Sequence, residues 1–83
     1  MSIQNDDDLL EIYAAASEVE AQRLVLLLQE DGVEATVRAT TISSFPTGGQ
    51  YLILVATSDQ HTARTTIANA RREGAVSDHG EML

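Results

Sequence analysis

A short loop contains the residues best suited to binding chemistry in this 83-residue chain. Segment 40–50 combines several hydroxyl side chains with a proline and a glycine pair, and an arginine stands at its entrance. Hydroxyls and free backbone N–H groups form anion-binding nests, so the segment predicts an anion loop. Its members would be Arg38, Ser43, Ser44, Thr47, Gly48 and Gly49. A glycine pair beside proline is above all a turn signal, so a plain linker is the alternative interpretation.

The remaining titratable residues do not combine into a reactive site. His61 is expected on the outer face of a helix, and His79 lies in the C-terminal tail beside Asp78. Even with Glu81, these tail residues are too few for a metal site, which needs several converging ligands and supporting hydrogen bonds. The sequence contains no nucleophile elbow, phosphate loop or dinucleotide fingerprint. We therefore predict no catalytic residue, no metal and no cofactor, and a protein that is not an enzyme.

Acidic residues outnumber basic ones by thirteen to five, which gives a net charge of −8. Such a charge repels nucleic-acid phosphate and anionic lipid, so neither is an expected partner. Solubility is the simplest interpretation of this charge, and an acidic surface that docks a basic protein is the alternative. No apolar run approaches the roughly 20 residues that span a bilayer, and residues 1–8 are acidic, unlike a signal peptide. A cytoplasmic location is expected.

The clearest structural signals lie in residues 17–37. Ser17 and Glu20 have the spacing of a capping box, in which each residue bonds the backbone N–H of the other. Gly32 is suited to the left-handed conformation that ends a helix. A helix is therefore expected over Glu18 to Asp31, followed by a strand over 33–39 in which apolar and polar residues alternate. The core stripe of that helix would be Ala21, Leu24, Val25 and Leu28, with Val19 and Leu26 on the opposite side.

Two more strands and a second helix complete the expected elements. The strand over 9–14 would place Leu10, Ile12 and Ala14 on one face and Leu9, Glu11 and Tyr13 on the other. The strand over 51–56 is apolar throughout, which suits the centre of a sheet. Thr57 or Ser58 would cap the second helix, and Gly74 would end it. Its core stripe would be Ala63, Ile67 and Ala70.

The resulting order is β-α-β-β-α, with the tail at 75–83 either loose or forming a short final strand at 75–77. If the apolar strand inserts between the first two, the sheet is antiparallel and both helices share one face. This is an α+β fold of the split β-α-β, or ferredoxin-like, arrangement. Residues 9–74 would form this single domain, behind a disordered acidic lead-in at 1–8.

The sheet face away from the helices is expected to expose apolar side chains. The central strand must add to it either Leu52 and Leu54, or Tyr51, Ile53 and Val55. Covering such side chains gains roughly 1.5–3 kcal/mol each, and exposed apolar patches usually mark contacts. A homo-oligomer through this face is expected, and cover by the lead-in or the tail is the alternative.

From Tyr13 to about Ala70 the chain resembles a prokaryotic family described as signal-transducing proteins, otherwise a domain of unknown function. The resemblance rests on Glu20, Ala21, Leu24, Leu28, Gly32, Val33, Ala35, Val37, Pro46, Val55, Asp59 and Ala63. It implies a ferredoxin-like domain similar in shape to the nitrogen-regulatory PII proteins, which assemble as oligomers. In PII proteins the loop between the second and third strands meets partners and helps to bind nucleotide. Segment 40–50 corresponds to that loop but lacks the basic residues that hold phosphate.

These observations favour a small non-enzymatic module that regulates or binds another protein, with a role in signal transduction. One alternative is a sensor that binds an anion or a nucleotide at segment 40–50. Another is an accessory subunit whose partner covers the apolar sheet face.

Overall fold

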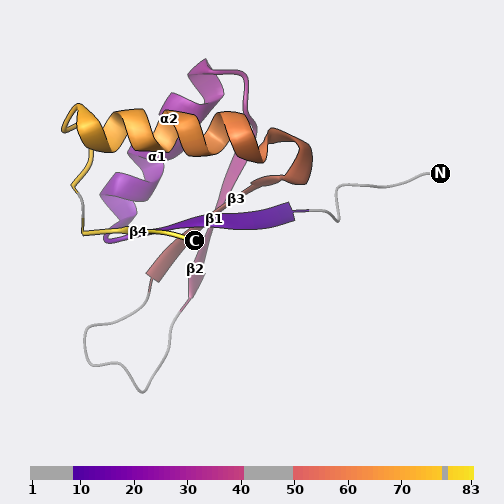
Figure 1. The fold of residues 1–83 in the computed structure, drawn as a ribbon. Coiled ribbons are helices and arrows are strands. Elements are labelled where there is room, and N and C mark those ends of the chain that lie inside the picture. The colour runs from indigo at the N-terminus through magenta and orange to yellow at the C-terminus, as the bar shows by residue number, and fades with distance from the viewer. Residues whose placement is uncertain (1–8, 41–49, 78) are drawn as a thin grey trace.

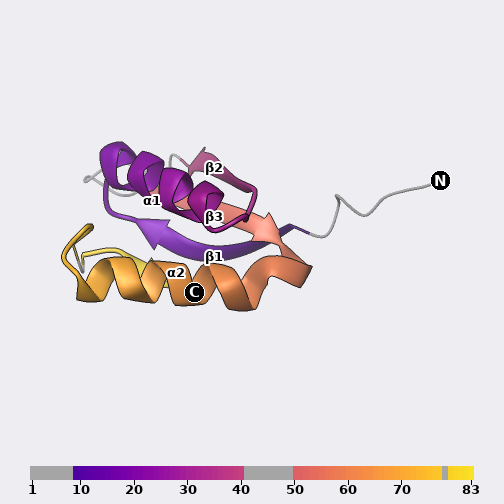
Figure 2. The same cartoon turned by 90° about the horizontal axis from the view of Figure 1, so that it is seen from above.

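Two helices cover one face of a four-stranded antiparallel sheet (Figure 1). The computed structural model describes residues 9–40, 50–77 and 79–83. Seen from above, α1 and α2 lie side by side over the sheet, with β1 visible between them (Figure 2). The elements are β1 (Leu9–Ala15), α1 (Glu18–Glu30), β2 (Ala35–Thr40), β3 (Gln50–Ala56), a 3-10 turn (Thr57–Asp59), α2 (Gln60–Arg72) and β4 (Glu81–Met82).

The apolar strand β3 lies inside the sheet, as its sequence predicts. The strand order is β2-β3-β1-β4, which is compatible with a ferredoxin-like arrangement. Each neighbouring pair is antiparallel, with Leu10 opposite Val55 and Val37 opposite Ile53.

The final strand exists, but not where the sequence suggested. It forms at Glu81–Met82, opposite Tyr13 and Ala14 of β1, whereas segment 75–77 is not a strand. The reason is that the chain first passes the start of α1, where Ser77 is held by hydrogen bonds and Val76 is buried. Only after this contact does the chain return to the sheet edge.

A β-bulge in β1 changes which of its side chains lie on the helix side of the sheet. The pairing passes from Glu11 opposite Leu54 to Tyr13 opposite Ile53, so Ile12 is an extra residue. Ile12 and Tyr13 are therefore both fully buried in the core beneath the helices. The expectation that Tyr13 shares the open face with Glu11 is wrong, because the extra residue interrupts the alternation.

The core stripes of the helices are largely confirmed. The buried residues of the two helices are Ala21, Leu24 and Leu28 in α1, and Ala63, Thr66, Ile67 and Ala70 in α2. Val25 is only half-buried, and Leu27 packs against the core in its place. The exchange arises because α2 packs along the Leu27 side of α1.

Both helices end in the same way, at glycines with positive φ. Gly32 has φ 83° and Gly74 has φ 80°. Past Gly32, the Val33 N–H donates to the Leu28 carbonyl at 2.8 Å, and past Gly74 the Ala75 N–H donates to the Ala70 carbonyl at 2.9 Å. These are Schellman motifs, so both predicted stops are confirmed.

The starts of the helices depart from the sequence-based expectation. The Glu20 N–H does donate to Ser17 Oγ at 3.2 Å, but the Glu20 carboxylate accepts from the Ser77 N–H at 3.1 Å and from Ser77 Oγ at 3.0 Å. The carboxylate thus ties the C-terminal segment to α1 instead of closing a capping box. A 3-10 turn precedes α2, so the N-cap position falls at Asp59 and not at Thr57 or Ser58.

We predict that Glu20→Ala lowers the free energy of unfolding by about 2 kcal/mol, because two hydrogen bonds to a partly buried carboxylate are lost. Urea denaturation followed by circular dichroism measures the change. Glu18→Ala is the matched control, since Glu18 is an exposed acid in the same helical turn. An equal loss in both variants would show that the contact with Ser77 contributes nothing.

Candidate functional site

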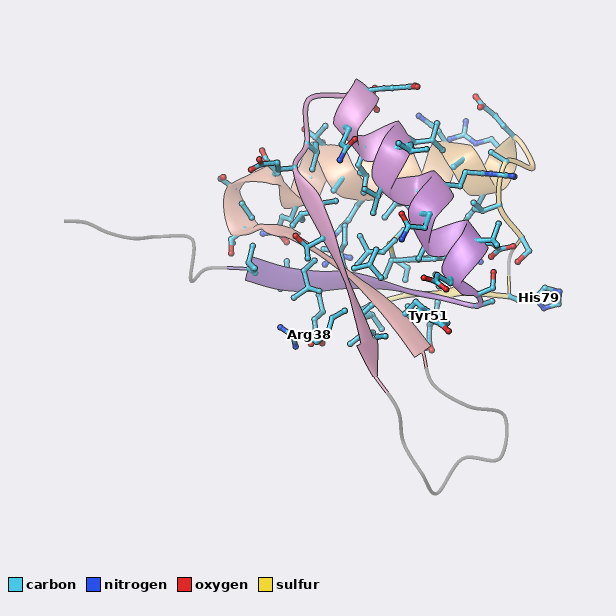
Figure 3. The ribbon with its side chains drawn as sticks, turned by 180° about the vertical axis from the view of Figure 1, so that it is seen from behind. Arg38, Tyr51 and His79 are labelled. Carbon is cyan, nitrogen blue, oxygen red and sulfur yellow. The ribbon has the colours of Figure 1, made fainter. Side chains whose placement is uncertain are left out.

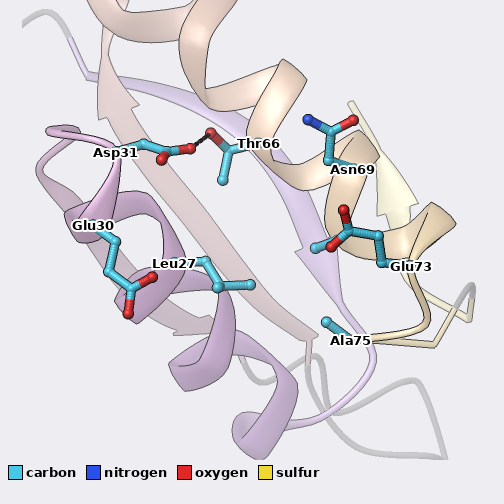
Figure 4. A pocket seen from close by; sticks show the side chains of 8 residues that line it. Leu27, Glu30, Asp31, Thr66, Asn69, Glu73 and Ala75 are labelled. Carbon is cyan, nitrogen blue, oxygen red and sulfur yellow. Dashed lines mark hydrogen bonds between the residues drawn. The ribbon is translucent and has the colours of Figure 1, made fainter.

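A pocket of about 150 Å³ lies between α1 and α2 (Figure 4). Its floor is apolar, and carboxylates stand around its rim. The lining residues are Leu27, Glu30 and Asp31 from α1 and its C-cap, and Thr66, Asn69, Ala70, Glu73 and Ala75 from α2 and the segment after it.

The pocket follows from the way the two helices run past each other. Arg23, Leu27 and Asp31 are spaced four residues apart, so they share one side of α1. The Arg23 Nη1 donates to the Ala75 carbonyl at 2.8 Å, and Thr66 Oγ1 donates to Asp31 Oδ2 at 2.5 Å. These two contacts join the antiparallel helices on either side of the pocket. Between them, the small side chains of α2 and of the segment after it leave space opposite Leu27.

The hydrogen bond between Thr66 and Asp31 closes one end of the pocket (Figure 4). Thr66 is only 8% exposed, and its hydroxyl is a polar group on the core side of α2. Asp31 is the C-cap of α1, where the helix dipole disfavours a negative charge. Donation from the hydroxyl offsets that cost and fixes the carboxylate at the rim.

The pocket rim is negatively charged. Glu30 extends from the end of α1 and Glu73 from the C-cap of α2, and Asp31 adds a third carboxylate (Figure 4). Two arginines flank the site, and both are engaged: Arg23 binds the Ala75 carbonyl, and Arg72 Nη2 donates to Asn69 Oδ1 at 2.6 Å. The arrangement offers acceptors to a positively charged group and an apolar floor to the stem that carries it.

Most of the predicted anion loop lies outside the described part of the chain. Ser43, Ser44, Thr47, Gly48 and Gly49 lie outside the described residues, so that loop stays a prediction. Arg38 lies on the sheet face away from the helices (Figure 3). Its Nη1 is 3.4 Å from Glu11 Oε2, and the two side chains are 57% and 44% exposed.

This ion pair passes across the central strand. Arg38 stands opposite Leu52 in β2–β3 pairing, and Glu11 stands opposite Leu54 in β1–β3 pairing. Ile53 and Val55 belong to the core beneath the helices, which leaves Leu52 and Leu54 for the other face. Leu54 is only 4% exposed there, so this face carries less open apolar surface than the sequence suggested. Self-association through it stays a prediction.

The histidines lie apart from the pocket. His61 is exposed on α2, as expected, and His79 is exposed after α2 (Figure 3). Asp78 lies outside the described residues. Within the described ranges, no group of three or more His, Asp and Glu side chains could hold a metal ion. Neither of the helices described there has the length and apolar character needed to cross a bilayer.

Sequence reasoning missed the pocket. In the sequence, Asp31 looks only like the last residue of a helix, and Glu30 and Glu73 look like ordinary surface acids. One signal was available: Thr66 falls among Ala63, Ile67 and Ala70 in the core stripe of α2. A polar residue in such a stripe requires a hydrogen-bond partner.

We predict that Thr66→Val lowers the free energy of unfolding by about 1 kcal/mol, because the hydrogen bond to Asp31 is lost while the shape of the side chain is kept. Thermal and urea denaturation measure the change. Thr65→Val is the matched control, since the Thr65 hydroxyl is exposed and donates to the His61 carbonyl of its own helix. If Thr65→Val lowers the free energy of unfolding by as much, the bond between the helices does not contribute to stability.

Comparisons with known proteins identify no relative of this chain. No protein-family model, no curated protein and no solved structure matches it. A proposal for its function therefore rests on the geometry of the described residues and on the charge of the chain.

Proposed function

We propose that this protein is a non-enzymatic interaction module that docks a basic segment of another protein in the pocket between α1 and α2. The observation that carries the proposal is the combination of an apolar floor with carboxylates from Glu30, Asp31 and Glu73. Lysine and arginine side chains have an apolar stem and a charged head, and this combination accepts both parts.

The size of the pocket favours one side chain over a free small molecule. Pockets for small ligands usually measure roughly 300–1,000 Å³, whereas this one measures about 150 Å³. Arginine is enriched among the residues that anchor protein interfaces. A single basic anchor, carried by a longer segment, matches the volume and the charge.

The surface beside the pocket offers room for the rest of such a segment. Val19 is 68% exposed and Leu26 is 60% exposed. On a helical period they share one side of α1 with Arg23 and Glu30. Apolar contact along α1 would therefore continue from the acidic rim. The net charge of −8 would also attract a basic partner at long range and speed its association.

The proposal extends to the type of domain, its role and its location. The strand order, with both helices on one face, favours a ferredoxin-like domain. The signal-transducing type is proposed on the resemblance of the sequence alone. A regulatory role in the cytoplasm is consistent with a small module that binds protein. The alternative of an anion or nucleotide sensor draws on Arg38 alone among the described residues, and one exposed arginine with Glu11 beside it at 3.4 Å is a weak basis for an anion site.

The test is binding of a short fluorescent peptide rich in arginine and leucine, measured by anisotropy at several salt concentrations. We expect affinity to fall as salt rises, because exposed charges carry the contact. The double variant Glu30→Gln/Glu73→Gln should bind about fivefold more weakly, if each exposed charge contributes about 0.5 kcal/mol. A peptide with glutamate in place of arginine should not bind.

The matched control is Glu18→Gln/Glu81→Gln, which changes the net charge equally but lies outside the pocket. Its affinity should stay close to that of the unmodified protein. Equal weakening by both double variants would mean that only overall charge matters, and the pocket would lose its assigned role.

A further inference from the structure

The outer edge of β2 has no strand beside it in the part of the chain that the structure describes. Among the described strands, β2 is the terminal one and pairs with β3 alone. An edge of this kind presents a row of backbone N–H and C=O groups that can pair with another strand. Its six residues, Ala35–Thr40, give it enough length for such a pairing.

The residues along this edge are self-complementary. Thr36 and Arg38 are exposed on the face away from the helices, and the exposed Glu34, which directly precedes β2, continues their alternation in the sequence. Ala35 and Val37 alternate with them and pack against the core on the helix side. If two copies pair antiparallel with Thr36 opposite Thr36, each Glu34 stands opposite Arg38 of the second copy. Opposite charges in such cross-strand positions are stabilising.

Neighbouring registers lack this match. A pairing centred on Val37 would place Arg38 opposite Thr36, and one centred on Ala35 would place it opposite Gly32. A pairing centred on Arg38 would set two like charges against each other. Of these registers, only the one centred on Thr36 sets Glu34 opposite Arg38. Because the two copies are related by symmetry, this pair forms twice.

We propose that two copies of this chain form a dimer through β2, with a twofold axis at Thr36 perpendicular to the sheet. The two sheets join into one, and the helices of both copies lie on the same face of it. Ala35 of each copy stands opposite Val37 of the other and extends the apolar layer beneath the helices. Since the pocket lies between α1 and α2, this dimer does not depend on the proposed function.

Charge reversal tests the pairing, with light scattering after size exclusion and sedimentation equilibrium as readouts. Glu34→Arg and Arg38→Glu should each raise the dimer dissociation constant about tenfold, because each sets like charges opposite each other at two places. The double variant Glu34→Arg/Arg38→Glu restores both pairs and should dimerise like the unmodified protein. Glu11→Gln, which removes only the ion pair within one copy, should leave the dimer intact.

A single cysteine provides the second test, because the chain has none of its own. Residues opposite each other in antiparallel strands have Cα atoms about 4.5–5.5 Å apart, within the roughly 4.4–6.8 Å that a disulfide spans. Thr36→Cys should therefore form a disulfide-linked dimer under mild oxidation much faster than Thr65→Cys, an exposed control on α2. Equal rates, a monomer at high micromolar concentration, or failure of the double variant to recover would overturn the proposal. If the protein is monomeric, the β2 edge is available to a strand from another protein.

Discussion

The central strand β3 sets the constraint on which the rest of the fold depends. It is hydrogen-bonded along both edges and carries aliphatic side chains on both faces. Ile53 and Val55 require a cover of apolar side chains, which the two helices supply. Leu54 requires cover on the other face, where the ion pair between Arg38 and Glu11 passes across the strand. Long charged side chains can shield apolar groups in this way while their charges stay in water.

Local patterns were predictable from the sequence, and contacts between distant residues were not. Gly32 and Gly74 end their helices as expected, because a left-handed residue is a requirement of the helix end itself. The apolar run of β3 likewise indicated its central position. The bulge at Ile12 was missed because alternation assumes an unbroken strand. It arises from pairing with β3, which the sequence of β1 alone does not contain.

The same distinction explains why the pocket could not be found from the sequence. Glu20 has the spacing of a capping box, yet its carboxylate binds Ser77, 57 residues away. Asp31 and Thr66 are 35 residues apart and meet only because the helices run antiparallel. Neither residue type nor spacing predicts such a meeting. The candidate site is therefore a product of helix packing, with ordinary surface acids brought to one rim.

The acidic pocket and the β2 edge have opposite demands on charge. A chain of net charge −8 opposes its own association through repulsion, so an interface between copies needs matched opposite charges. Arg38 is one of only five basic residues, and its place on β2, four residues after Glu34, meets that need. The pocket, by contrast, gains from uncompensated negative charge. In the proposed dimer the negative field of two copies adds together, while the helices remain on one face. Association through β2 would then strengthen the long-range attraction of a basic partner to both pockets.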